Sequence, residues 1–158
     1  SGCIIISLAK NVADISCTGS DISKQALLVA KENAKANEVE VEWERSDLFE
    51  NISGTFDLIV SNPPYIRTDV VPTLAPELAY EPKMALDGGA DGMDFYRAIL
   101  TNYAQNLADG GAFLFEFGYD QEKDAAALAA AHRLGFAPLF DLGGRFRAAR
   151  MTRQQRKV

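Results

Sequence analysis

The sequence predicts an α/β fold built on a mostly parallel sheet. Short runs of β-branched and aromatic residues alternate with helical patterns along most of the chain. The fractions of hydrophobic (47%) and charged (24%) residues are typical of a globular protein, and no apolar run is long enough to cross a bilayer. With 158 residues, the chain has the size of one domain with a core of its own.

The first third of the chain predicts two short strands with a helix between them. Residues 15–19 are a short strand candidate that ends at Ser20-Asp21. Ser23 is placed to cap a helix that continues to about residue 37. Residues 39–44 then alternate between apolar side chains and glutamates, which indicates a strand with one buried face.

The middle of the chain predicts a buried strand and then a long irregular segment. Residues 56–60 form a mainly apolar run bounded by Gly54 and by an Asn-Pro-Pro sequence, which fits a strand buried on both faces. Prolines and the Gly88-Gly89 pair indicate irregular structure over residues 66–92. Loops of this length in a compact domain are usually functional or disordered.

The last third predicts two helices and three strands. Asp94 is placed to cap a helix whose apolar face reaches Leu107 and which ends at Gly110-Gly111. The elements expected after it are a strand over residues 112–117, an alanine-rich helix over 121–134, and strands over 136–142 and 146–151.

The net charge of −6 conceals an uneven distribution. Residues 145–158 carry six basic side chains and no acidic one, so residues 1–144 hold 10 basic and 22 acidic residues, a net charge of −12. An acidic body repels a phosphate backbone, which argues against a DNA substrate. The basic end predicts either a solvated strand and tail or a contact for RNA, the ribosome or an acidic partner.

The cysteine content and the first residues bear on the cellular compartment. Cys3 and Cys17 are too few for a disulfide framework or a thiolate metal site. The sequence also lacks the basic, apolar and small-residue pattern of a secretory signal at its start. We therefore expect a cytoplasmic protein with free thiols, without a metal and without a membrane partner.

The most specific motif is Asn62-Pro63-Pro64-Tyr65, directly after the strand expected to end at Ser61. Ligands of open parallel sheets bind beyond the carboxyl ends of the strands, so the motif is expected in a binding site. The two prolines stiffen the backbone and remove two donors, which leaves rigidly aimed carbonyl oxygens. Asn62 adds a side-chain carbonyl and Tyr65 adds a flat ring.

Such a corner suits a planar NH2 group, either an amide or an aromatic amine. Two acceptors bind the two hydrogens while the Tyr65 ring holds the plane. The nitrogen lone pair then points at an electrophile, and the acceptors stabilise the positive charge that develops on nitrogen. The alternative interpretation is a proline-stiffened turn with an Asx hydrogen bond.

Two acidic residues follow the earlier strands. Asp21 is placed to accept hydrogen bonds from both hydroxyls of a ribose. Asp47 is placed to accept one from an adenine amino group, with Leu48 against the ring. Each residue alone is as typical of a turn or a cap, but their repetition at successive strand ends favours binding.

These pieces occur in the order found in class I S-adenosylmethionine-dependent methyltransferases, and the chain resembles the release factor glutamine methyltransferases of the HemK/PrmC family. The pieces that carry the resemblance are Ser1-Gly2-Cys3, Asp21-Ile22-Ser23, Ser46-Asp47-Leu48-Phe49, Asn62-Pro63-Pro64-Tyr65, Glu81 to Tyr96, and Glu116 to Gln121. Amino-group adenine methyltransferases share the Asn-Pro-Pro-Tyr motif, whereas the Glu81 to Tyr96 stretch is the more family-specific part.

The resemblance implies a three-layer Rossmann-like fold, mostly parallel with an antiparallel C-terminal strand. It implies methyl transfer from S-adenosylmethionine to the side-chain amide nitrogen of the glutamine in the Gly-Gly-Gln motif of peptide-chain release factors. The residues implied for the cofactor are Gly2, Asp21, Ile22, Asp47, Leu48 and Asn62. Those implied for catalysis are Asn62, Pro63 and Tyr65, and those for the substrate are Asn62, Pro63, Pro64, Tyr65, Glu81 and Pro82.

The resemblance also bears on the start of the chain. The β-branched isoleucines within residues 3–7 alone predict a strand, but the family has a helix here and Ile4, Ile5, Leu8 and Ala9 fit one helical face. Family members carry a strand, a glycine-rich turn and a helical domain before the position of Ser1. We therefore expect residues 1–158 to be a partial catalytic domain that lacks the first strand and most of the glycine-rich loop.

Two alternatives stay open from the sequence. The same corner suits adenine, so a second hypothesis is an adenine amino-group methyltransferase acting on DNA or RNA. A third is a non-catalytic remnant that docks a partner through residues 66–92. Cofactor binding would separate the third hypothesis from the first two.

Overall fold

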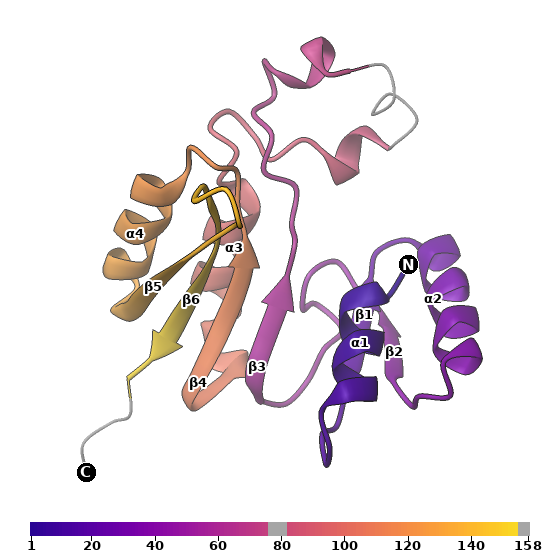
Figure 1. Ribbon diagram of the computed structural model, residues 1–158. Coiled ribbons are helices and arrows are strands. Elements are labelled where there is room, and N and C mark those ends of the chain that lie inside the picture. Colours follow the sequence, from indigo (N-terminus) through magenta and orange to yellow (C-terminus); the bar gives the residue numbers. More distant parts are fainter. Residues whose placement is uncertain (76–81, 155–158) are drawn as a thin grey trace. The chain divides into compact units, whose positions relative to one another are not determined.

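The computed structural model describes residues 1–75 and 82–154 (Figure 1). The chain divides into two compact units, Ser1–Ser53 and Gly54–Val158, and each unit carries its own sheet.

The first unit contains the helices α1 (Cys3–Asn11) and α2 (Lys24–Ala36) and the strands β1 (Thr18–Asp21) and β2 (Glu42–Arg45). The two strands pair in parallel, from Thr18 opposite Glu42 to Asp21 opposite Arg45. Their carboxyl ends therefore lie at the same edge, where the Asp21 carbonyl accepts a hydrogen bond from the Ser46 N–H at 3.2 Å.

The half-buried indole of Trp43 packs against two glycines of the first unit. A Cβ atom at Gly19 would lie 2.5 Å from the Trp43 ring, and one at Gly2 would lie 2.8 Å from it. Both glycines are needed because the backbone approaches the indole this closely. The buried apolar residues of the two helices are Ile6, Leu27, Ala30 and Ala34.

Several expectations for the first unit are confirmed. The Ser23 hydroxyl accepts a hydrogen bond from the Ala26 N–H at 3.2 Å and so caps α2. The helix implied by the resemblance is present as α1, whereas the β-branched pattern alone predicted a strand there. Both strands are shorter than expected, since only the four residues from Thr18 pair with β2.

The second unit contains a sheet with the order β3-β4-β6-β5. Its strands are β3 (Phe56–Ser61), β4 (Leu107–Glu116), β5 (Leu134–Phe140) and β6 (Phe146–Arg153). Strands β3 and β4 are parallel, and β6 is antiparallel to both of its neighbours. The expected combination of parallel pairing with an antiparallel C-terminal strand is confirmed.

The helices and turns of the second unit come between its strands. The helices are α3 (Asp94–Asn102) and α4 (Glu122–Ala131), and the 3-10 turns are η1 (Val71–Thr73), η3 (Lys83–Ala85) and η4 (Ala104–Asn106). Figure 1 shows that the chain extends beyond the carboxyl end of β3, and the described residues between β3 and α3 form no strand of either sheet. The irregular segment expected over residues 66–92 is confirmed for its described residues.

An aromatic cluster anchors α3 to β4. The Tyr96 ring stacks on Phe117 with 4.2 Å between ring centroids and meets Phe115 edge-on at 5.6 Å. The Tyr96 hydroxyl donates a hydrogen bond to the Glu116 carbonyl, and burial raises the pKa of this phenol. This cluster fixes α3, and with it the turn that precedes α3, against the end of β4.

The expectation that β3 is buried on both faces is wrong. Ile59 is buried, but Leu58 is 45% exposed. β3 is the edge strand of its sheet and pairs with β4 along one side among the described residues.

The expected bounds of α3 are also wrong. Met93 rather than Asp94 occupies the N-cap position, because Asp94 is already the first helical residue. The helix ends at Asn102, and Gly110-Gly111 lies within β4. A Cβ at Gly111 would lie 2.9 Å from the Asp57 carbonyl, so this glycine permits close pairing of the strands rather than stopping a helix.

Over residues 1–75 and 82–154, no helix combines the length and the apolar character needed to cross a bilayer.

Candidate functional site

In the first unit, Asp21 and the turn after β2 lie at the same edge of the sheet. Asp21 is the last residue of β1, and its carboxylate accepts a hydrogen bond from the Ser23 N–H at 2.8 Å. The turn is closed by the buried Ser46, whose hydroxyl accepts a hydrogen bond from the Asn51 N–H at 2.9 Å. Leu48 in this turn adopts a left-handed conformation with φ 48°.

A shallow pocket of about 220 Å³ lies at this edge, lined by Ile22, Arg45, Ser46, Asp47 and Asn51. It brings together Ile22 and Asp47, which the sequence placed at a cofactor site. The Arg45 side chain donates a hydrogen bond to the Ile22 carbonyl at 3.1 Å and ties the two strand ends together. The exposed Asp47 carboxylate is thus available to a ligand that enters the pocket.

Gly2, Asp21 and Leu48, also predicted to bind the cofactor, are not among the residues that line this pocket. Gly2 precedes α1 with φ 71°, and the Ile6 N–H donates a hydrogen bond to its carbonyl at 3.0 Å. The structure therefore gives Gly2 a packing role against Trp43 and a place at the start of α1.

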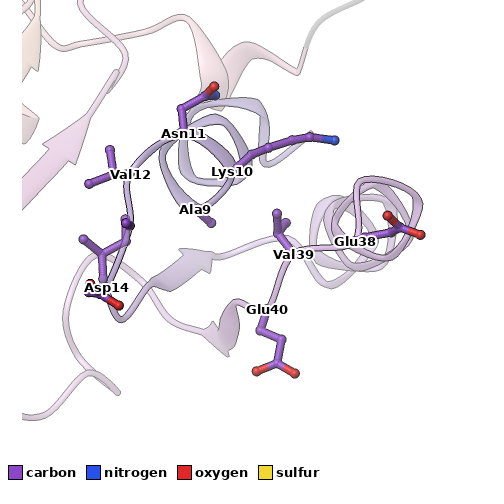
Figure 2. Close-up of a pocket in the computed structure, with 10 residues that line it drawn as sticks. Ala9, Lys10, Asn11, Val12, Asp14, Glu38, Val39 and Glu40 are labelled. Carbon is purple, nitrogen blue, oxygen red and sulfur yellow. The ribbon is translucent and has the colours of Figure 1, made fainter.

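A larger open pocket of about 500 Å³ lies where α1 and α2 end, away from the carboxyl ends of the strands (Figure 2). Its lining comes from residues 9–15 and 38–40. Figure 2 shows the side chains of Lys10, Glu38 and Glu40 around it. None of the predicted site residues lines this pocket, and the candidate site lies instead at the carboxyl ends of the strands.

In the second unit, the Asn62-Pro63-Pro64-Tyr65 motif directly follows β3, as expected. Asn62 is exposed, Pro63 is buried, and Pro64 and Tyr65 are half-buried. The motif therefore presents the Asn62 side chain to solvent while the Pro63 ring anchors the backbone behind it.

The long segment after the motif returns to pair with it. The Ile66 N–H donates to the Leu86 carbonyl at 3.1 Å, and the Gly88 N–H donates to the Ile66 carbonyl at 2.8 Å. Thr68 extends this pairing through its N–H to the Gly89 carbonyl at 3.0 Å and through its hydroxyl to the Asp87 carboxylate at 2.7 Å. The returning segment of residues 86–89 thus holds the end of the motif in place.

Two glycines that the sequence marked only as loop residues prove to be part of this packing. A Cβ at Gly88 would lie 2.6 Å from the Pro64 carbonyl, and one at Gly92 would lie 2.2 Å from the Tyr65 carbonyl. Gly92 also has φ 75°, a conformation that favours glycine. The Gly-Gly pair at residues 88–89 is evident in the sequence. Its contact with the Pro64 carbonyl is not, because the two segments are far apart in the chain.

An ion-pair cluster closes the turn before α3. The Arg97 guanidinium donates to the Asp91 carboxylate at 2.7 and 2.9 Å and to Asp94 at 2.6 Å. The hydrogen bonds from Arg97 lower the pKa of the Asp91 carboxyl from 3.8 to about 2, and Arg97 has its own pKa raised by the two acids. The side chains stay partly exposed, so each pair contributes below about 1 kcal/mol.

The substrate residues predicted at the entrance are placed only in part. Pro82 is exposed and precedes η3, where its carbonyl accepts a hydrogen bond from the Ala85 N–H at 2.8 Å. Glu81 lies outside the described residues.

The described part of the basic end is partly engaged within the fold. Arg153 donates to the carbonyls of Ala104 and Leu107 and lies 3.3 Å from the Asp109 carboxylate. Arg147 lies 3.8 Å from Asp141. Arg156 and Lys157 lie outside the described residues.

Comparison with known proteins identifies the family. The model of the methyltransferase small domain family matches residues 1–91, more than half of the chain. The chain belongs to this family. Its fold agrees, since the chain resembles a crystal structure of a methyltransferase from Pyrococcus furiosus with a TM-score of 0.69 at 16% identity, covering 96% of this chain and 70% of that one.

The names of the curated relatives also give the class of substrate that those proteins methylate. The chain is 46% identical to a release factor glutamine methyltransferase of Agrobacterium fabrum over 96% of this chain and 54% of the relative. It is 39% identical to a ribosomal protein uL3 glutamine methyltransferase of Neisseria gonorrhoeae over 98% of this chain and 52% of the relative. These matches confirm the resemblance drawn from the sequence. The chain spans about half the length of the curated relatives it matches.

We predict that Gly92→Ala destabilises the second unit by about 3 kcal/mol, since it combines a strained φ with a clash against the Tyr65 carbonyl. Gly144→Ala is the matched control, because Gly144 has φ 74° but no atom within 4 Å of its Cβ position. It should cost about 1 kcal/mol. Urea unfolding measures both values, and equal costs would show that the Tyr65 contact is absent.

The Asp91 carboxyl should titrate near pH 2 in the native protein and return toward 3.8 in Arg97→Met. Because its folded pKa is lowered, Asp91 stabilises the turn above about pH 4, and this contribution disappears as the pH falls through about 2. NMR detection of the side-chain carboxyl carbon gives both midpoints. An unchanged midpoint in the variant would refute the ion pair as the cause.

Proposed function

We propose that the chain forms part of the catalytic domain of an S-adenosylmethionine-dependent protein glutamine methyltransferase. The proposed substrate is the side-chain amide of the glutamine in the Gly-Gly-Gln motif of peptide-chain release factors. The observation that carries the proposal is the Asn62-Pro63-Pro64-Tyr65 corner, which follows β3 with Asn62 exposed and its backbone held by the returning segment. The curated relatives named above supply the substrate class.

In this proposal the corner binds the amide NH2 group. The Asn62 side-chain carbonyl and the Pro63 backbone carbonyl accept its two hydrogens, and the Tyr65 ring packs on its plane. The Pro63 carbonyl need not move during the reaction because the Pro63 ring is buried and proline restricts the backbone. Fixed acceptors stabilise the charge that develops on the amide nitrogen without reorganisation.

The first unit would hold the cofactor. Asp21 would accept from the ribose hydroxyls, and its carboxylate is already oriented by the Ser23 N–H. The pocket of Ile22 and Asp47 offers an apolar side chain and an exposed carboxylate, which suits an adenine ring with its amino group. Gly2 and Leu48 would contact the same ligand through their backbone and side chain. When bound, S-adenosylmethionine supplies an electrophilic methyl group.

The substrate could instead be ribosomal protein uL3, as the Neisseria relatives are named for it. The higher identity to the Agrobacterium release factor enzyme favours the release factor. An adenine substrate is disfavoured by the acidic body of the chain and by the protein substrates in the relatives' names.

The remaining proposals concern cellular context and chain organisation. Release factors act in the cytoplasm, so we propose a cytoplasmic enzyme. We also propose that residues 1–158 are a partial catalytic domain, in keeping with the share of the relatives that they cover. Entry of substrate past Glu81 and Pro82, and a contact of the basic end with RNA or the ribosome, stay predictions.

Asn62→Ala should lower the rate of methyl transfer to a release factor at least a hundredfold, because it removes one of the two acceptors of the amide. Its free energy of unfolding should change by less than about 0.5 kcal/mol, since Asn62 is exposed. Transfer of a labelled methyl group to purified release factor measures the first value, and urea unfolding measures the second.

The control variant is Asn102→Ala, which replaces another exposed asparagine at the end of α3 and should leave the rate unchanged. Assays with uL3 and with adenine-containing nucleic acid run beside the release factor. Wild-type rates in Asn62→Ala, or methylation of uL3 or nucleic acid alone, would defeat the proposal.

A further inference from the structure

The side chain of Gln121 is buried at a junction of three backbone segments. It is 5% exposed and belongs to the residue that precedes α4. Its amide oxygen accepts a hydrogen bond from the Gly118 N–H at 2.8 Å, and its amide nitrogen donates to the carbonyls of Tyr65 and Gly92, both at 3.2 Å. Both amide hydrogens and the oxygen of one side chain are therefore engaged.

These contacts determine the orientation of the amide. An N–H faces the oxygen and two carbonyls face the nitrogen, so a rotated amide would place like groups against each other at all three positions. The backbone of Gln121 is also fixed, since its N–H donates to the Gly118 carbonyl at 3.1 Å and its carbonyl accepts from Ala125 at 2.9 Å. The side-chain NH2 group of Gln121 is therefore held in one position and one orientation.

The three partners come from the parts of the second unit that surround the corner. Tyr65 is the last residue of the motif after β3, Gly92 lies in the turn before α3, and Gly118 follows β4. β3 and β4 are parallel, so their carboxyl ends meet at one edge of the sheet, and Gln121 joins them there. A side chain in place of Gly92 or Gly118 would crowd this amide, with Cβ positions 2.6 and 3.1 Å from its atoms.

We infer that Gln121 is the positioning residue of the Asn62 to Tyr65 corner, an inference that rests on the proposed function. It holds the Tyr65 carbonyl, while the segment of residues 86–89 holds Ile66. The amide nitrogen that receives the methyl group is not activated by a base. The rate of transfer therefore depends on how accurately the carbonyl acceptors of the corner hold the amide. A displacement of about 1 Å at such a site costs on the order of a hundredfold in rate.

Two variants of Gln121 distinguish a positioning role from a purely structural one. Gln121→Met keeps the length of the side chain and removes all three hydrogen bonds. Gln121→Glu keeps the acceptor for Gly118 but removes the two donors at neutral pH. The matched control is Gln105→Met, because Gln105 is an exposed glutamine whose amide donates to the Asn102 carbonyl at 2.6 Å.

Steady-state kinetics at a temperature where circular dichroism shows every variant fully folded gives the first readout. Both Gln121 variants should lose about tenfold to a hundredfold in kcat toward the release factor, with less than a twofold change in cofactor affinity. Gln105→Met should match the wild type. A wild-type kcat in Gln121→Glu, or equal losses in kcat and cofactor affinity, would overturn the inference.

Amide hydrogen exchange gives a second readout that needs no activity. The amides of Ile66 and Gly88 should exchange at least tenfold faster in Gln121→Met, whereas Phe113 and Phe115 in the core of β4 should keep wild-type rates. Uniform acceleration would indicate a purely structural role. If the wild type transfers no methyl group to a release factor, the proposed function fails, and the exchange rates still decide whether Gln121 holds the corner.

Discussion

The backbone pairing of Ile66 with Leu86 and Gly88 is the contact on which the second half of the proposed site depends. Without this pairing, the hydrogen bond from Gln121 to the Tyr65 carbonyl would be the main contact at the second end of the Asn62 to Tyr65 corner. The pairing requires that the returning backbone approach the Pro64 carbonyl closely, and only a glycine at position 88 leaves the space for it. Strand β3 fixes one end of the corner, and this pairing fixes the other.

A corner that is fixed at both ends suits a reaction whose rate depends on the orientation of the substrate amide. An amide nitrogen is a poor nucleophile because its lone pair is delocalised, and the described parts of the corner offer carbonyl acceptors and an aromatic ring. Proline rigidity, the buried Pro63 ring and the Gln121 amide all restrict the same few atoms. In our account, the accuracy of this placement takes the role that a general base has in other enzymes.

Local patterns in the sequence predicted the features that depend on neighbouring residues. The Ser23 cap, the alternation around Trp43 and the position of the motif directly after β3 are confirmed. The bounds of α3 and the exposure of Leu58 were mispredicted because sheet position and strand pairing decide them. The sequence placed Gln121 only at the start of a helix and in a stretch shared with the family, since its partner Tyr65 lies 56 residues earlier and no periodicity connects them.

Mass spectrometry of a reaction between the protein, a release factor and S-adenosylmethionine with a deuterated methyl group tests the central claim most directly. Fragmentation of the peptide that contains Gly-Gly-Gln locates the added mass. The account predicts one deuterated methyl group on the side-chain nitrogen of that glutamine, and none when Asn62 is replaced by alanine. A methyl group found on adenine in added nucleic acid, or on another side chain of the release factor, would contradict it.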